Sequence, residues 1–192
     1  MELDSDFKVI APIEEVWKTV MDVERVATAV PGAELTAKLS DTSYQGVVKV
    51  KVGPLTMQYR GQIELVSRDD TAHIAVFKGK GQEKAGQGTA EGTATVSLTE
   101  HGEETAGVVH GDIALSGKAA AMGKGVISSV AQQIMKVFAG NLQKILAGGE
   151  DAGTGESAEG AVNGMSLVAG AIGSMFHRGE KNGEKDTETD RG

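Results

Sequence analysis

Apolar and polar residues alternate along much of the chain before residue 115, as they do in β-strands that bury one face. The alternation is nearly strict from 55 to 65, where every second position is apolar: Leu55, Met57, Tyr59, Gly61, Ile63 and Leu65. Successive side chains of a strand point to opposite faces, so this segment is predicted to be a half-buried strand. The same period predicts strands over 3–10, 88–98 and 105–115. Val48, Val50 and Val52 form an apolar face before a turn at Gly53-Pro54, and Ile74 and Val76 continue the sheet after a turn at Asp69-Asp70.

The apolar spacing lengthens to three and four residues over 118–147. One stripe contains Met122, Val126, Val130, Ile134, Val137, Phe138, Leu142 and Ile145, which predicts a single long helix that covers the sheet. Two short helices are predicted near the N-terminus. Pro12 takes the first helical position of one, with acidic residues in its first turn, and Asp22 caps the other, which ends at Pro31-Gly32.

This order of elements predicts an α+β fold. One strand, two short helices, about six antiparallel strands and a long C-terminal helix together favour a curved sheet wrapped around the helix. Glycine-rich and acidic residues follow Ile145, and this is the composition of a linker. We therefore predict a domain over 1–147, a flexible linker over 148–160, an amphipathic segment over 161–178 and a disordered polar tail over 179–192.

Composition and charge narrow the class of partner. The chain has 19 Lys and Arg against 27 Asp and Glu, a net charge of -8, which disfavours binding to a nucleic-acid backbone. It has no cysteine, which excludes disulfides and thiolate chemistry. The first six residues are acidic, unlike a signal peptide, and no apolar run reaches the length of a membrane span. A cytoplasmic protein is expected.

No set of residues has the spacing of a catalytic or metal site. Gly79-Lys80-Gly81 and Gly86-Gln87-Gly88 lie between strands and lack a phosphate-loop pattern. The acid pairs Asp69-Asp70 and Glu103-Glu104 fall at turns, where carboxyl groups are solvated. The histidines show no metal-ligand spacing, and Ser128-Ser129 has no identifiable histidine partner. The sequence predicts neither catalytic nor metal-binding residues, and the domain is expected not to be an enzyme.

Small residues occupy many positions on the predicted inner face of the sheet, namely Gly61, Ala90, Gly92, Ala94, Gly107 and Gly111. Two interpretations remain open: the missing side chains leave a cavity for an apolar ligand, or they permit strong curvature with the helix packed directly on them. The candidate ligand-binding residues are Val48, Val50, Met57, Tyr59, Ile63, Ile74, Val76, Met122, Val126, Val130 and Ile134. Tyr44 and Tyr59 are candidates for a hydrogen bond to a ligand carbonyl, or for tyrosines that reach the sheet edge.

The segment from 161 to 177 has an apolar helical face made of Val162, Met165, Val168, Ile172, Met175 and Phe176. Three internal glycines disfavour a free helix at about 1 kcal/mol each. We predict that these residues bind a membrane surface weakly and reversibly, or else pack on a protein.

Several short sequences, taken in order, resemble one family. They are Ala11-Pro12 with Val16-Trp17, Val30-Pro31-Gly32-Ala33-Glu34, Val52-Gly53-Pro54, Tyr59-Arg60-Gly61, Gly79-Lys80-Gly81 and Gly86-Gln87-Gly88 before a strand. Over 1 to about 147 the chain resembles the CoxG-like family of carbon monoxide dehydrogenase proteins. That family belongs to the START-like, or SRPBCC, proteins with a helix-grip fold, which include the birch-pollen allergens.

The resemblance implies a partner and a role. The partner would be the molybdenum-containing aerobic carbon monoxide dehydrogenase, and the role that of an accessory protein at the inner face of the cytoplasmic membrane. Because carbon monoxide oxidation releases electrons that a respiratory membrane takes up as quinol, the expected ligand is a non-covalently bound quinone, menaquinone or ubiquinone. A membrane-recruitment adaptor without a cavity, or an assembly factor for the dehydrogenase, is the alternative.

Overall fold

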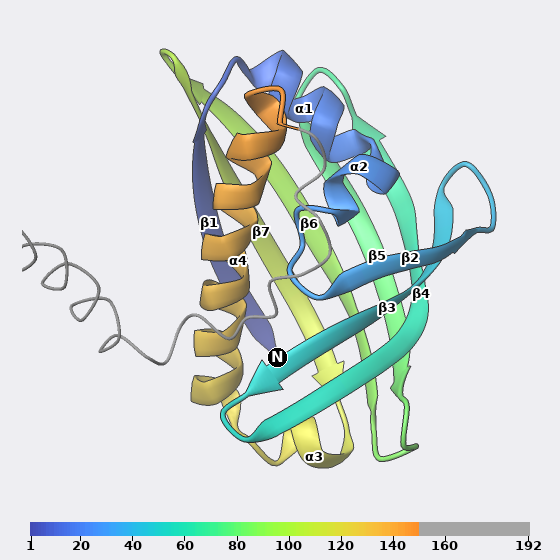
Figure 1. Ribbon diagram of the computed structural model, residues 1–192. Helices are drawn as coiled ribbons and strands as arrows, with labels where there is room; N and C mark the ends of the chain where they lie inside the picture. The colour runs from blue at the N-terminus through green and yellow to red at the C-terminus, as the bar shows by residue number, and fades with distance from the viewer. Residues whose placement is uncertain (150–192) are drawn as a thin grey trace, which may run out of the picture. The chain divides into compact units, whose positions relative to one another are not determined.

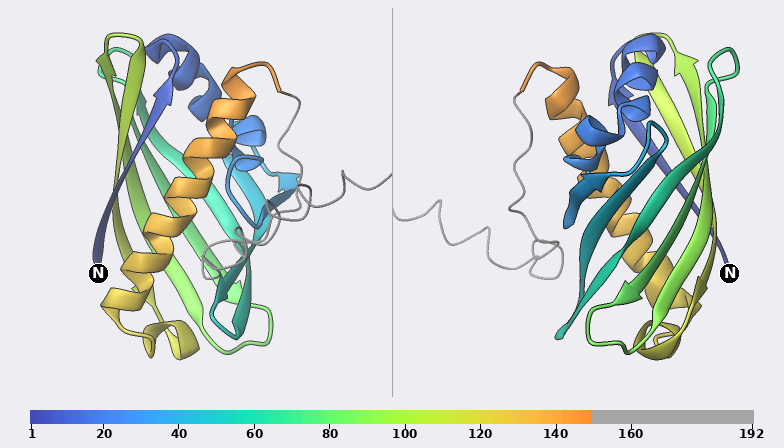
Figure 2. Two further views of the ribbon diagram at one scale, coloured as in Figure 1. Left: turned by 60° about the vertical axis from the view of Figure 1, so that its left-hand side comes forward. Right: turned by 90° about the vertical axis from the view of Figure 1, so that its right-hand side faces the viewer.

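The computed structural model describes residues 1–149, which form one curved antiparallel sheet and a helix across it (Figure 1). The elements in chain order are β1 (Glu2–Ile10), α1 (Ile13–Met21), α2 (Val23–Ala27), β2 (Ala33–Lys38), β3 (Ser43–Val52), β4 (Leu55–Asp69), β5 (Ile74–Glu83), β6 (Thr89–His101), β7 (Glu104–Leu115), α3 (Gly117–Ala120) and α4 (Lys124–Leu146). The seven strands lie in the order β1-β7-β6-β5-β4-β3-β2. Figure 2 shows α4 running obliquely along the concave side. The predicted α+β helix-grip arrangement is confirmed.

The two short helices begin and end as the sequence suggests, with one shift. Pro12 is the residue before α1 rather than its first helical residue, and Glu14 and Glu15 lie in the first turn. The Asp22 side chain accepts a hydrogen bond from the backbone N–H of Arg25 at 3.0 Å and so caps α2. This cap satisfies one of the N–H groups that a helix start leaves without an intrahelical partner.

The single long helix predicted over 118–147 is wrong at its start. A four-residue helix, α3, comes first, and α4 begins only after Gly123, whose φ of 78° lies in the left-handed region. Glycine adopts this conformation without a Cβ penalty. The apolar spacing continues from Met122 through Val126, so periodicity alone does not register the break.

The buried core consists of two separate clusters. The larger one joins α1, the β1 end of the sheet and the second half of α4, where Leu142 and Ile145 are almost fully buried. Phe7 and Phe138 meet edge to face there, with ring centroids 5.3 Å apart. The smaller cluster is built on Met57, Tyr59 and Ala119, near the β3–β4 turn and α3. Because no third cluster is formed by the described residues, the space between these two is bridged by neither.

A cross-strand row of glycines brings the backbones of β3, β4 and β5 close together. Gly46 pairs with Gly61, and Gly61 pairs with Gly81. A Cβ built on Gly61 would lie 2.0 Å from the carbonyl oxygen of Lys80, so no larger residue fits without moving the backbone. At Gly107 the missing side chain is replaced by the ring of Phe7, which would lie 2.2 Å from a Cβ. These glycines therefore serve backbone and ring packing, as the curvature interpretation expects.

A hydrogen-bonded group ties α1 to the β4–β5 turn. The indole N–H of Trp17 donates to the Asp70 carboxylate at 2.7 Å, and Arg68 donates to the same oxygen. His73, in the same turn, meets the Trp17 ring edge to face. The hydrogen bond from Trp17, followed by the one from Arg68, holds the pKa of Asp70 below its usual value.

This lowered pKa predicts an acid-dependent contribution to stability. A carboxyl group whose pKa is depressed by folding stabilises the protein above its unfolded pKa, and the contribution is lost as pH falls through the folded value. Between pH 5 and pH 2, chosen to span a carboxyl pKa of about 4, wild type should lose more stability than Asp70→Asn. Urea unfolding at each pH measures the difference, with Glu103→Gln as the control. Equal acid dependence in wild type and Asp70→Asn would contradict the prediction.

Candidate functional site

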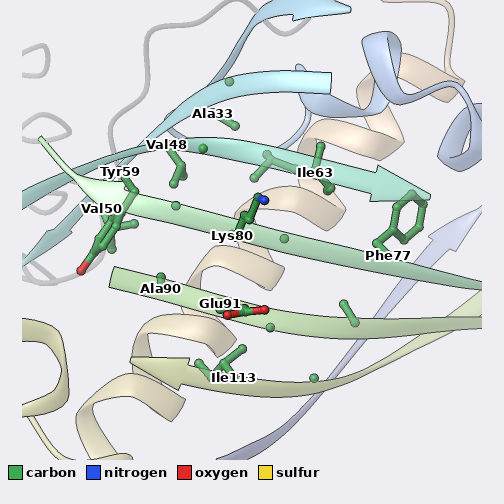
Figure 3. A pocket seen from close by; sticks show the side chains of 18 of the residues that line it. Ala33, Val48, Val50, Tyr59, Ile63, Phe77, Lys80, Ala90, Glu91 and Ile113 are labelled. Atoms are coloured by element: carbon green, nitrogen blue, oxygen red, sulfur yellow. The ribbon is translucent and has the colours of Figure 1, made fainter. Parts of the chain in front are cut away.

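A cavity of about 650 Å³ lies between the concave face of the sheet and α4. Residues of α1 and α2, of β2 to β7, and of α3 and α4 line it. Figure 3 shows lining side chains from several neighbouring strands gathered around this space, including Val48, Ile63, Phe77 and Ile113. The volume is within the range of about 300 to 1,000 Å³ that is typical of small-molecule sites.

Seven of the eleven candidate residues are brought together around this cavity. They are Val48, Val50, Met57, Tyr59, Ile63, Met122 and Val130. The strand members lie on two adjacent strands, β3 and β4, whose register pairs Val48 with Tyr59 and Val50 with Met57. The period-two pattern was sufficient here because both strands alternate cleanly along their length.

The other four candidates do not line the cavity. Ile74 and Val76 lie on the outer face of β5, since Ala75 is fully buried and Phe77 lines the cavity. Apolar residues occupy both faces at the start of this strand, so the sequence left its orientation open. Val126 is 42% exposed in the first turn of α4, and Ile134 is half-buried outside the lining.

Sequence reasoning missed several residues that close the cavity. Val20, Val23 and Val26 of the two short helices line it, as do Phe77 and Gly79 of β5. Only the packing of α1 and α2 over the sheet shows that their apolar faces meet this space. For β5, the alternation of Ala75, Phe77 and Gly79 was the available signal, but Ile74 and Val76 masked it.

Two glycines face open space, unlike those that pack against backbone. A Cβ on Gly79 would meet nothing closer than the Gln62 carbonyl oxygen at 3.9 Å, and a Cβ on Gly111 nothing closer than the Leu3 carbonyl oxygen at 3.6 Å. Both residues line the cavity. The two sequence interpretations thus apply to different glycines: some permit close packing of strands, and others leave volume.

The inner surface of the cavity is almost wholly apolar. Glu34, Gln62, Lys80, Glu91 and Thr93 contribute to the lining, but each occupies an outward position on its strand. Glu91, for example, forms an ion pair at 3.5 Å with Lys78 on the exposed face. Such a surface suits a ligand that is mainly hydrocarbon.

The two tyrosines have different positions. Tyr44 is not part of the lining, and its hydroxyl donates to the Asp41 carbonyl oxygen over a long 3.5 Å contact. Tyr59 does line the cavity and is 9% exposed. Burial, followed by the negative charge of Glu83, raises the pKa of the Tyr59 hydroxyl.

The polar groups elsewhere on the domain are engaged in local contacts. His110 is exposed and pairs with Asp4 at 2.6 Å, and the ring of His73 contacts Glu14 at 3.2 Å. Ser129 donates to the Gly125 carbonyl oxygen of its own helix. Within residues 1–149, no three acidic or histidine side chains are grouped as metal ligands. In the same part of the chain, no helix combines the length and apolarity that crossing a membrane requires.

The predicted membrane-binding residues, Val162, Met165, Val168, Ile172, Met175 and Phe176, lie outside the described residues. The same holds for the polar tail predicted over 179–192 and for all but the first two residues of the linker predicted over 148–160.

Comparison with known proteins identifies both a family and a fold. The family model of CoxG, a component of carbon monoxide dehydrogenase, matches residues 6–147. A conserved protein from Geobacillus kaustophilus has a similar structure, with 20% identity, a TM-score of 0.68, and coverage of 77% of this chain and 96% of that chain. The Zhui aromatase/cyclase from Streptomyces sp. R1128 is similar at 15% identity and a TM-score of 0.54, over 78% of this chain and 99% of its own. At these identities the likeness concerns the fold alone. A comparison with curated proteins gave no significant match.

Proposed function

Since this chain belongs to the CoxG family of carbon monoxide dehydrogenase proteins, we propose that it is a non-enzymatic accessory protein of the aerobic carbon monoxide dehydrogenase. It binds an apolar ligand in its cavity and links the enzyme to the membrane. The observation that carries this proposal is the 650 Å³ apolar cavity between two core clusters, in a domain of that family.

A respiratory quinone is the leading ligand. Carbon monoxide oxidation releases two electrons, and a quinone reduced to quinol would carry them as a neutral apolar molecule. The ring and isoprenoid chain of menaquinone or ubiquinone suit an apolar lining, and burying such surface favours binding by roughly 25 cal/mol per Å². The cavity supports this carrier over an adaptor with a solid interior, because Met57, Ile63, Met122 and Val130 surround a space of ligand size instead of filling it.

Solvent extraction tests the proposal. Full-length protein, incubated with bacterial membranes and repurified, is extracted with organic solvent, and the extract is analysed by mass spectrometry. A near-stoichiometric quinone is the expected result. The absence of any quinone would count against the carrier, and the adaptor would then be the better explanation of the family relationship.

The proposed site of action is the inner face of the cytoplasmic membrane, with the apolar segment 161–178 as the attachment. Its support is the sequence pattern, which places six large apolar residues on one helical face. A segment of this kind lies in the lipid interface and binds reversibly.

Deleting residues 150–192 should abolish co-sedimentation with liposomes while shifting the melting temperature of the domain by less than about 2 °C. Ile172→Asp should have the same effect on co-sedimentation, because it places a charge on the face meant for hydrocarbon. Ser166→Asp, a charge off that face, is the matched control and should still bind. Equal partitioning of full-length and truncated protein would show that the segment is not the anchor.

A further inference from the structure

We propose that the hydroxyl of Tyr59 is the hydrogen-bond donor for a neutral carbonyl group of the ligand. The ligand's polar head would then lie at the β3–β4 end of the cavity. This inference rests on the proposed function and deepens it, since it assigns the chemistry of the ligand head and the residue that recognises it.

Tyr59 provides the polar atom that is missing elsewhere on the inner wall. Among the described residues that line the cavity, it is the one inward-facing side chain with a hydrogen-bonding group, since the other polar ones occupy outward strand positions. Figure 3 places its ring at one end of the cavity, with the hydroxyl directed away from Ile63 and Phe77. The cavity thus has one polar end and an apolar remainder.

The contact that the hydroxyl makes within the protein is weak. Its acceptor is the sulfur of Met57, at 3.8 Å, and a thioether is a poor hydrogen-bond acceptor. Tyr59 is more than nine-tenths buried. A buried hydroxyl without a good acceptor is unfavourable, so a ligand oxygen that accepts from it would be bound in preference to a hydrocarbon.

The surroundings keep this hydroxyl protonated. Burial, and then the negative charge of Glu83, raises its pKa. Glu83 pairs with Tyr59 across the β4–β5 ladder, and its carboxylate accepts from the backbone N–H groups of Ala85 at 2.8 Å and Gln87 at 3.3 Å. The group facing the ligand is therefore a donor, with a fixed negative charge beside it.

The same surroundings disfavour an acidic ligand. Lys80 is the one basic residue in the lining of the described domain, and its side chain is exposed on the outer face. A ligand carboxylate would thus be buried without a cation, and close to Glu83. Burying an unpaired charge costs far more than burying a carbonyl. The cavity is therefore suited to ketones and quinones, and a fatty acid is a poor fit.

Three probes with the same ring system separate these contributions. Menadione carries two carbonyl groups, 2-methylnaphthalene has none, and 2-naphthoate has a carboxylate. Menadione also alkylates thiols, but the chain has no cysteine, so its binding can be measured by calorimetry on the full-length protein. Wild type should bind menadione more tightly than 2-methylnaphthalene, and 2-naphthoate at pH 8 most weakly.

Tyr59→Phe removes the hydroxyl and keeps the ring. Menadione should bind this variant about three- to tenfold more weakly, the usual effect of one neutral hydrogen bond, while 2-methylnaphthalene should change less than about twofold. Tyr44→Phe is the matched control, because Tyr44 is equally buried but lies outside the cavity lining, and both probes should bind it as they bind wild type.

Two outcomes would overturn the inference in different ways. Unchanged menadione affinity in Tyr59→Phe would show that the hydroxyl is not the donor and would leave the proposed carrier function intact. If wild type bound neither menadione nor 2-methylnaphthalene, the carrier function would fail, and the assignment of Tyr59 with it. Binding of 2-naphthoate as tight as that of menadione would refute the selection of neutral ligands.

Discussion

Gly79→Phe should abolish quinone binding while leaving the domain folded. Gly79 lies in the middle of the sheet, paired with Ile63 on one side and Gly92 on the other, and all three line the cavity. Its Cβ direction is open, with nothing closer than 3.9 Å, so an aromatic ring can enter without displacing backbone. The ring would occupy the space that the ligand needs.

The expected loss is large because the ligand's hydrocarbon would remain in water. Excluding only a few methylene groups, at roughly 0.8 kcal/mol each, weakens binding by about 30-fold or more. Titration with menaquinone bearing a four-isoprene chain measures the effect. Aromatic residues favour strands over glycine, so the free energy of unfolding should stay level or rise.

Val76→Phe is the matched control for this substitution. Val76 lies on the same strand but on its outer face, outside the cavity lining, so an added ring there should leave quinone affinity unchanged. Wild-type affinity in Gly79→Phe would mean that the ligand does not occupy this cavity.

Gly61→Ala should be the most damaging single-methyl change in the sheet. The new Cβ would lie 2.0 Å from the Lys80 carbonyl oxygen and 2.6 Å from the Gly81 Cα. Both are backbone atoms of the neighbouring strand, so the clash cannot be relieved by rotating a side chain. We expect a loss of about 3 kcal/mol, at the upper end for overpacking, and a melting temperature lower by roughly 6 to 12 °C.

Gly111→Ala is the comparison that isolates the clash. The two glycines both line the cavity, but at Gly111 the nearest atom to a Cβ is 3.6 Å away, an ordinary contact. This variant should be as stable as wild type or slightly more so, because alanine restricts the unfolded chain more than glycine does. Thermal unfolding of both variants tests the pair, and equal melting temperatures would refute the distinction.

The candidate site was predictable wherever alternation was unambiguous. In β3 and β4 every second residue is apolar, so the assignment of Val48, Val50, Met57 and Tyr59 to the inner face required only the pleat of a strand. At the start of β5 the residues Ile74, Ala75, Val76 and Phe77 are all apolar. The buried face there is chosen by the pairing of β5 with β4, where the register shifts between Leu65 and Ser67.

The helix stripe was informative about type and less so about individual contacts. Phe138, Leu142 and Ile145 are buried as the spacing predicts, whereas Val126 is exposed. The difference arises because α4 makes its main contacts with β1 and α1, and its first turn begins beyond a glycine break. A stripe shows that a helix has an apolar face, but not how far along the helix a partner surface extends.

By itself, the sequence determined the order and type of the elements, the two helix starts and the family, because these depend on local periodicity, capping residues and short words at turns. Only the tertiary structure decided what the glycines do. A missing Cβ has the same local meaning at Gly61 and Gly79, yet one faces the backbone of the next strand and the other faces empty space. That difference depends on strand register and on where α4 lies, both set by contacts between residues far apart in the chain.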